Sequence, residues 1–244
     1  MEYTTKLLSK SPKRTMWSVI ILGINLTILL ALTFNFFSGG VAKNTGLTRN
    51  LTLSFLQENQ FNLMLFPWIL IQATMVIPKI PIKYLYQLKT PQQITLKIWK
   101  DVWRYQLKFV FIEIVTAIIA LFYFRSSLLA HTISASNEFL GGIIFIQFQG
   151  WLISTTFVLI SVKNLAKNTT TTFVFTILLI LLNLCNTTFF HENYSFLGLV
   201  NILNVSRLSF LLVFLNFLML IFTIVLEEIF IEWLIRQSDF TISY

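Results

Sequence analysis

The chain has 244 residues, of which 56% are hydrophobic and 11% are charged, and its formal net charge is +8. Soluble globular domains carry about 25% charged residues, so this composition excludes a water-soluble fold that hides its apolar surface in one core. The apolar residues come in long runs instead of alternating with polar ones. These runs predict an integral membrane protein with a single transmembrane domain over residues 1–244.

Six apolar segments approach or reach the length of about 20 residues that a helix needs to cross about 30 Å of hydrocarbon. In chain order they are roughly 17–38, 61–77, 109–124, 139–162, 173–190 and 208–226. The third looks short because Lys108 interrupts it, but a lysine at the boundary can extend its charged end to the headgroups. The sequence therefore predicts an all-α, polytopic integral membrane protein with six transmembrane helices.

The positive residues indicate how these segments are oriented. With the amino terminus inside, fourteen of the eighteen lysines and arginines fall in cytoplasmic regions, and four fall outside. This asymmetry satisfies the positive-inside rule and predicts a multi-pass cell-membrane protein with both termini in the cytoplasm. The positive charge is thus explained by topology and gives no support to nucleic-acid binding. The abundance of Phe, Ile, Leu, Asn and Lys over Gly and Ala suggests AT-rich coding in a low-GC bacterium.

The inner connection from Pro78 to Lys108 is the most informative stretch between the spans. Its apolar residues fall on one helical face, which comprises Ile94, Ile98, Trp99, Val102 and Trp103. Its opposite face comprises Lys97, Lys100, Asp101, Arg104 and Lys108. The pattern predicts an amphipathic cytoplasmic helix between spans two and three. Such a helix either rests on the lipid surface or docks a cytoplasmic partner, and both can hold together.

Glu113 is the one acidic residue well inside a predicted span. A charged side chain near the bilayer centre costs on the order of 2.5–3.5 kcal/mol, although Glu113 lies only about one turn past Phe109, near the cytoplasmic end. Two roles stay open for this intramembrane polar candidate, namely helix packing and the lining of a translocation path. The outer connection 191–207 could likewise line a pathway, as a short interfacial or re-entrant segment.

Enzymatic and metal-binding patterns are incomplete. The stretch Leu226–Arg236 is similar to the paired-glutamate motif of intramembrane prenyl-protein-processing proteases, but no histidine follows it. In membrane endopeptidases that trim bacterial signalling peptides the histidine precedes the cysteine, whereas here Cys185 precedes His191. His131 and His191 lie on separate outer loops, whereas zinc usually takes four ligands. No phosphate-binding loop is present. We therefore predict no catalytic residues, no metal and no cofactor.

This layout resembles the membrane subunit of type-2 ATP-binding-cassette exporters, of the small bacterial kind associated with peptide export and lantibiotic or bacteriocin self-protection. The closest local likeness is Tyr84–Lys108 (YLYQLKTPQQITLKIWKDVWRYQLK), which is similar to the basic linker after their second span. The resemblance implies an amphipathic or antimicrobial peptide as substrate. It also implies two partners, namely a separate cytoplasmic ATPase and a second permease subunit, which is either another copy of this chain or a sister permease. The candidates for ATPase docking are Lys83, Lys89, Lys97, Lys100 and Arg104.

Other functions stay open beside this resemblance. The main alternative is a non-transport membrane immunity or accessory protein that binds a peptide or a partner protein. The small-molecule capture subunit of vitamin importers also has six helices, but the Ala-x-x-x-Ala contact motif of its first span is missing here. Substrate identity, transport direction and the choice between homodimer and heterodimer are left open by the sequence.

Overall fold

The structure is a computed structural model. It describes residues 12–38, 50–51, 54, 64–81, 88, 90–124, 135–166, 169–189 and 210–237. Within these ranges the regular elements are helices and no strand occurs, which confirms the all-α prediction. The helices are α2 (Pro12–Ser38), α5 (Phe66–Val76), α7 (Pro91–Tyr123), α9 (Ala135–Leu165), α10 (Thr169–Phe189) and α12 (Phe210–Gln237).

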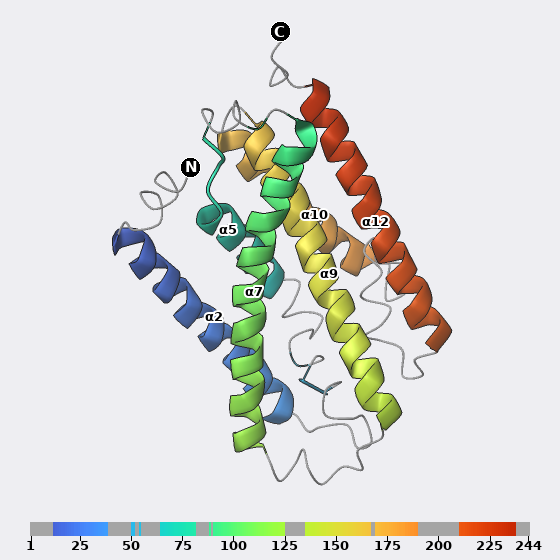
Figure 1. The fold of residues 1–244 in the computed structure, drawn as a ribbon. Helices are drawn as coiled ribbons and strands as arrows, with labels where there is room; N and C mark the ends of the chain where they lie inside the picture. Colours follow the sequence, from blue (N-terminus) through green and yellow to red (C-terminus); the bar gives the residue numbers. More distant parts are fainter. Residues whose placement is uncertain are drawn as a thin grey trace.

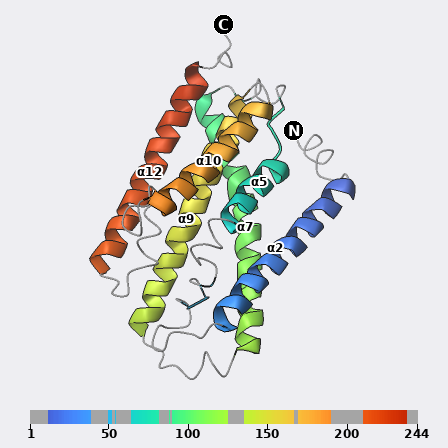
Figure 2. The ribbon, with the colours of Figure 1, turned by 180° about the vertical axis from the view of Figure 1, so that it is seen from behind.

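Successive helices alternate in direction, so the start of α2 and the end of α12 lie at the same end of the bundle (Figure 1). The helices α7 and α9 run side by side through the middle, and α9 contacts α12 on one flank while α7 contacts α2 on the other. The shorter helices α5 and α10 cover the rear of this pair (Figure 2). The central position of α9 makes it the natural meeting point for side chains from its neighbours.

Two described segments, Pro91–Tyr123 and Gly141–Leu165, are long and apolar enough to cross a membrane. Helices of this length and hydropathy are those expected of a membrane protein, although a buried core helix can pass the same test. Each of the six predicted spans overlaps one helix of the structure. Six crossings of the membrane stay a prediction.

The helix in the second predicted span is short. With 11 residues, α5 is about 16 Å long, which is less than the hydrocarbon thickness of about 30 Å. Pro67 is compatible with the first turn, but Leu65 before it is already helical, with φ −71° and ψ −48°. The end of α5 follows from Pro78, which disfavours helical geometry in the residue before it. Ile77 is accordingly extended, with φ −80° and ψ 112°. Residues 61–63 of the predicted span lie outside the described residues.

The predicted amphipathic segment before the third span is helical, but it is continuous with the helix of that span. The helix α7 runs through 33 residues without interruption, so 94–108 and most of the predicted span 109–124 form one element. Its start is capped by Thr90, whose side chain accepts a hydrogen bond from the backbone nitrogen of Gln93, and Pro91 follows in the first turn. No further proline or glycine occurs before Tyr123, so the sequence gives the helix no place to kink.

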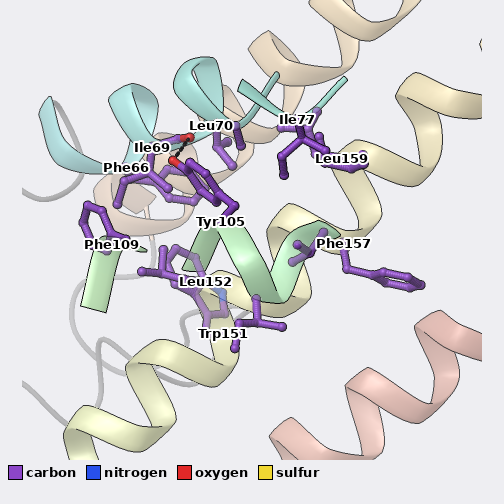
Figure 3. Packing of buried hydrophobic residues seen from close by; sticks show 14 of the residues in the cluster. Phe66, Ile69, Leu70, Ile77, Tyr105, Phe109, Trp151, Leu152, Phe157 and Leu159 are labelled. Carbon is purple, nitrogen blue, oxygen red and sulfur yellow. Dashed lines mark hydrogen bonds between the residues drawn. The ribbon is translucent and has the colours of Figure 1, made fainter. Parts of the chain in front are cut away.

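The apolar face of this segment packs mainly inside the protein and not on lipid. Ile94, Ile98 and Val102 are buried, and the ring of Trp99 stacks on Phe157 of α9 with centroids 4.2 Å apart. Only Trp103 is strongly exposed, with half of its surface accessible. The surrounding core joins α5, α7 and α9 (Figure 3). Its labelled members are Phe66, Ile69, Leu70, Ile77, Tyr105, Phe109, Trp151, Leu152, Phe157 and Leu159.

Candidate functional site

Polar side chains are buried along α9, although the chain as a whole is apolar. Burying a polar group is costly unless it is hydrogen-bonded, and polar groups inside membranes are often tied to function. The pairs that these side chains form therefore identify candidate positions. The buried polar residues of α9 are Gln147, Gln149, Ser154, Thr155, Thr156, Ser161 and Asn164.

Glu113 belongs to a hydrogen-bonded group between α7 and α9. Its Oε2 atom accepts a hydrogen bond from Nε2 of Gln149 at 2.6 Å. The Oε1 atom of Gln149 accepts one from Nε2 of Gln106 at 2.5 Å. Gln106 and Glu113 are seven residues apart, which is about two helical turns, so they lie on the same side of α7 and Gln149 bridges them. We call these three residues the Glu113 cluster.

The Glu113 cluster has unused hydrogen-bonding capacity. Glu113 and Gln106 are each 1% exposed, and the Oε1 atom of each has no hydrogen-bond partner among the described residues. Among the described residues, the carboxylates in ion pairs are those of Asp101 and Glu232, so Glu113 has no cation beside it there. Both oxygens can accept a hydrogen bond from a water molecule or from the donor group of a ligand, and the carboxylate can also take up a proton. No group of three His, Cys, Asp or Glu suited to a metal occurs among the residues described.

A second contact from α9 reaches α12. The hydroxyl of Ser154 donates a hydrogen bond to Oε2 of Glu227 at 2.6 Å. Further along α12, Arg236 lies 3.9 Å from Glu232, which is one turn away on the same helix. That pair lies within α12 and contributes only about 0.2–0.5 kcal/mol, whereas Glu227 contacts Ser154 of α9.

The ends of α5 and α9 hold each other at one end of the bundle. The amine of Lys163 donates to the backbone oxygens of Thr74 and Ile77, each at 2.5 Å. In the other direction, the backbone nitrogen of Ile80 donates to Oδ1 of Asn164 at 2.7 Å, and Lys79 donates to Ala166. The last carbonyls of a helix lack intrahelical partners, so a lysine amine is a suitable donor for them. These contacts fix where the connection from α5 to α7 begins.

The predicted docking residues differ in whether an acidic side chain neutralises their positive charge. Lys97 is paired with Asp101 at 2.7 Å, and Arg104 lies 3.9 Å from the same carboxylate. Lys100 is exposed and forms no ion pair with any residue that the structure describes. The exposed cations of this surface are therefore Lys100 and Arg104. Lys83 and Lys89 lie outside the described residues.

Several other predicted positions are outside the described part of the structure. Cys185 falls within α10, but its side chain is not among those described. His131, His191 and the connection 191–207 are also outside it. Their predicted roles stay predictions.

The sequence analysis identified Glu113 but missed its two partners. Gln106 and Gln149 carry no charge, so they do not affect a count of positive and negative residues. The available signal was the spacing of seven between Gln106 and Glu113, together with glutamines within the otherwise apolar segment 139–162. That signal shows which face of α7 is polar, but not that α9 lies against it.

Comparisons with protein-family models, with curated proteins and with solved structures found no match for this chain. The resemblance to exporter membrane subunits therefore depends on the residues and layout of this chain alone.

Proposed function

We propose that the chain is the permease subunit of an ATP-driven exporter that moves amphipathic or antimicrobial peptides out of the membrane or the cell. The Glu113 cluster is the observation that carries this proposal. It places a carboxyl group and two amides between α7 and α9, the two described helices that are long and apolar enough to cross a membrane, with free acceptor oxygens on both Glu113 and Gln106. A peptide with cationic or amide donors offers hydrogen bonds to such oxygens if α7 and α9 separate during transport.

In this proposal six helices cross the cell membrane, and both termini are cytoplasmic. The common placement of the start of α2 and the end of α12 supports this arrangement (Figure 1). The proposed partners are a cytoplasmic ATPase and either a second copy or a sister permease. Lys100 and Arg104, in the first half of α7, are then available to the ATPase, and ATP-driven movement of that subunit would act directly on α7.

The proposed orientation predicts which positions can be labelled from each side. Cysteines introduced one at a time at cytoplasmic positions should react with an impermeant reagent only after the membrane is opened, because fourteen positive residues retain those regions inside. These positions are Ser9, Lys89 and Ser238. The outer positions, which should react in intact cells, are Thr48, Ser134 and Ser195. The native Cys185 should first be replaced by serine. Labelling at Lys89 in intact cells would contradict the orientation.

If a separate subunit hydrolyses ATP for this permease, ATPase activity should depend on that subunit. The purified chain should hydrolyse no ATP, because its sequence has no phosphate-binding loop. With an ATPase encoded in the same operon it should co-purify, and hydrolysis should change when a cationic amphipathic peptide is added. The matched control is the ATPase alone with the same peptide. If no such ATPase co-purifies, the permease proposal fails and the alternative of a non-transport immunity or accessory protein takes its place.

A further inference from the structure

A second group of polar side chains joins α2, α5 and α7. Nε1 of Trp68 donates to Oδ1 of Asn25 at 2.7 Å, and Nδ2 of Asn25 donates to Oε1 of Gln72 at 3.1 Å. The hydroxyl of Tyr105 donates to the same Gln72 oxygen at 2.8 Å. An indole N–H can only donate, which fixes the orientation of the Asn25 amide and, through it, that of Gln72. The Gln72 amide nitrogen is consequently left buried, with no hydrogen-bond partner among the described residues.

This group borders a cavity of about 30 Å³ between the three helices. A space of that size holds one or two water-sized atoms or groups. Its remaining lining consists of apolar side chains and one cation, namely Ile21, Leu22, Val76, Phe109, Ile112 and Lys108. Lys108 is exposed and forms no ion pair with the residues that the structure describes. The side-chain oxygens of Asn25 and Gln72 already accept hydrogen bonds, so the cavity has free donors and a positive charge.

The surface beside this cavity is apolar. Ile20 and Ile24 of α2 are 40% and 38% exposed, and a side chain at Gly23 would meet nothing within 4 Å. In both views of the ribbon, the first half of α2 leans away from the other helices (Figures 1 and 2). The proposed orientation places Lys108 at the inner boundary of the third span, which is the level of the lipid headgroups.

We propose that this cavity is a binding site for an anionic phospholipid of the inner leaflet. A headgroup phosphate pairs with Lys108, and one of its oxygens accepts a hydrogen bond from the Gln72 amide nitrogen inside the cavity. The acyl chains lie outside the cavity, along the exposed apolar residues of α2. The Gln72 nitrogen without a partner among the described residues requires an acceptor, the lysine favours an anion, and a space of about 30 Å³ admits a phosphate oxygen but no peptide side chain of ordinary size. This site would serve a permease and an accessory protein equally, so it rests on the proposed orientation, with Lys108 at the inner membrane surface, and not on transport.

The site can be tested by measuring the lipid that stays bound to the full chain. The protein is reconstituted in vesicles of equal parts phosphatidylglycerol and phosphatidylcholine and extracted in mild detergent, and retained lipid is quantified by native mass spectrometry. Wild type should retain phosphatidylglycerol in preference to phosphatidylcholine. Lys108→Gln should reduce that retention about fivefold, the effect of losing one lysine contact to an anionic lipid.

Two further variants make the test specific. Lys100→Gln removes the same charge from another exposed position of α7 outside the cavity, and it should leave retention unchanged. Val76→Phe fills the cavity without changing the charge, and it should reduce retention. Equal losses in Lys108→Gln and Lys100→Gln would show only diffuse attraction and overturn the site. Displacement of phosphatidylglycerol by millimolar inorganic phosphate would show that free phosphate occupies it, which also contradicts the proposal.

Discussion

Replacing Phe157 with alanine should lower the free energy of unfolding by about 3 kcal/mol, at the lower end of the range measured for buried phenylalanines. The Phe157 side chain is fully buried and stacks on Trp99 at an interplanar angle of 11°. Removal of the ring leaves a cavity, and the atoms around it lose their van der Waals contacts. This loss of packing occurs in a membrane as well, because it does not depend on water outside the protein. The value is at the low end because lipid provides little hydrophobic driving force between helices.

The matched control is Phe222→Ala on α12, since Phe222 is 58% exposed. A surface substitution of this kind should change the free energy of unfolding by less than about 0.5 kcal/mol. Unfolding of both variants in mixed micelles, followed by tryptophan fluorescence and by circular dichroism, gives the comparison. Equal destabilisation of the two variants would contradict the assignment of Phe157 to the core.

The helices were largely predictable because long apolar runs specify them locally. The six predicted segments each overlap a helix, and Pro78 after α5 explains where that helix ends. Hydropathy did not predict that the helix continues through Lys108. A single lysine interrupts an apolar run, but it does not interrupt the hydrogen bonds along the helical backbone. The sequence from Pro91 to Tyr123 contains no helix-breaking residue after its first position, and this continuity is the better guide.

The surroundings of the amphipathic face were not predictable from α7 alone. A face containing Ile94, Ile98 and Val102 fits both a membrane surface and a protein core, since both are apolar. The difference comes from Phe157 on α9, which supplies the partner for Trp99. Helix pairing is a long-range property, and a single sequence gives no direct measure of it. The same reason explains why Gln149 was missed while Glu113 was found.

Gln149 and Glu113 should respond differently to substitution. Gln149→Leu leaves the Glu113 carboxyl oxygen and the Gln106 amide without their partners. Each buried polar group left unpaired costs about 1–3 kcal/mol, so the loss of both partners should lower the free energy of unfolding by roughly 2–6 kcal/mol. Combining it with leucine at Gln106 and Glu113 should recover much of the loss, because an apolar group of similar size needs no hydrogen bond. Failure of the triple variant to recover stability would contradict this account.

Glu113→Gln separates the two roles left open for Glu113, helix packing and the lining of a transport path. Glutamine keeps an oxygen that can accept the hydrogen bond from Gln149, so the free energy of unfolding should change by less than about 1 kcal/mol. An amide would fill a pure packing role at lower cost than a carboxyl group buried without a cation, so a carboxyl at this position favours a functional role, which in the proposed permease is transport. We therefore expect peptide export to fall at least tenfold, a loss of about 1.4 kcal/mol or more, while membrane abundance and ATPase co-purification are unchanged. Export assays in cells beside unfolding measurements on the same variant decide the matter. Normal export by Glu113→Gln would make the residue a packing element and remove the main support for a path between α7 and α9.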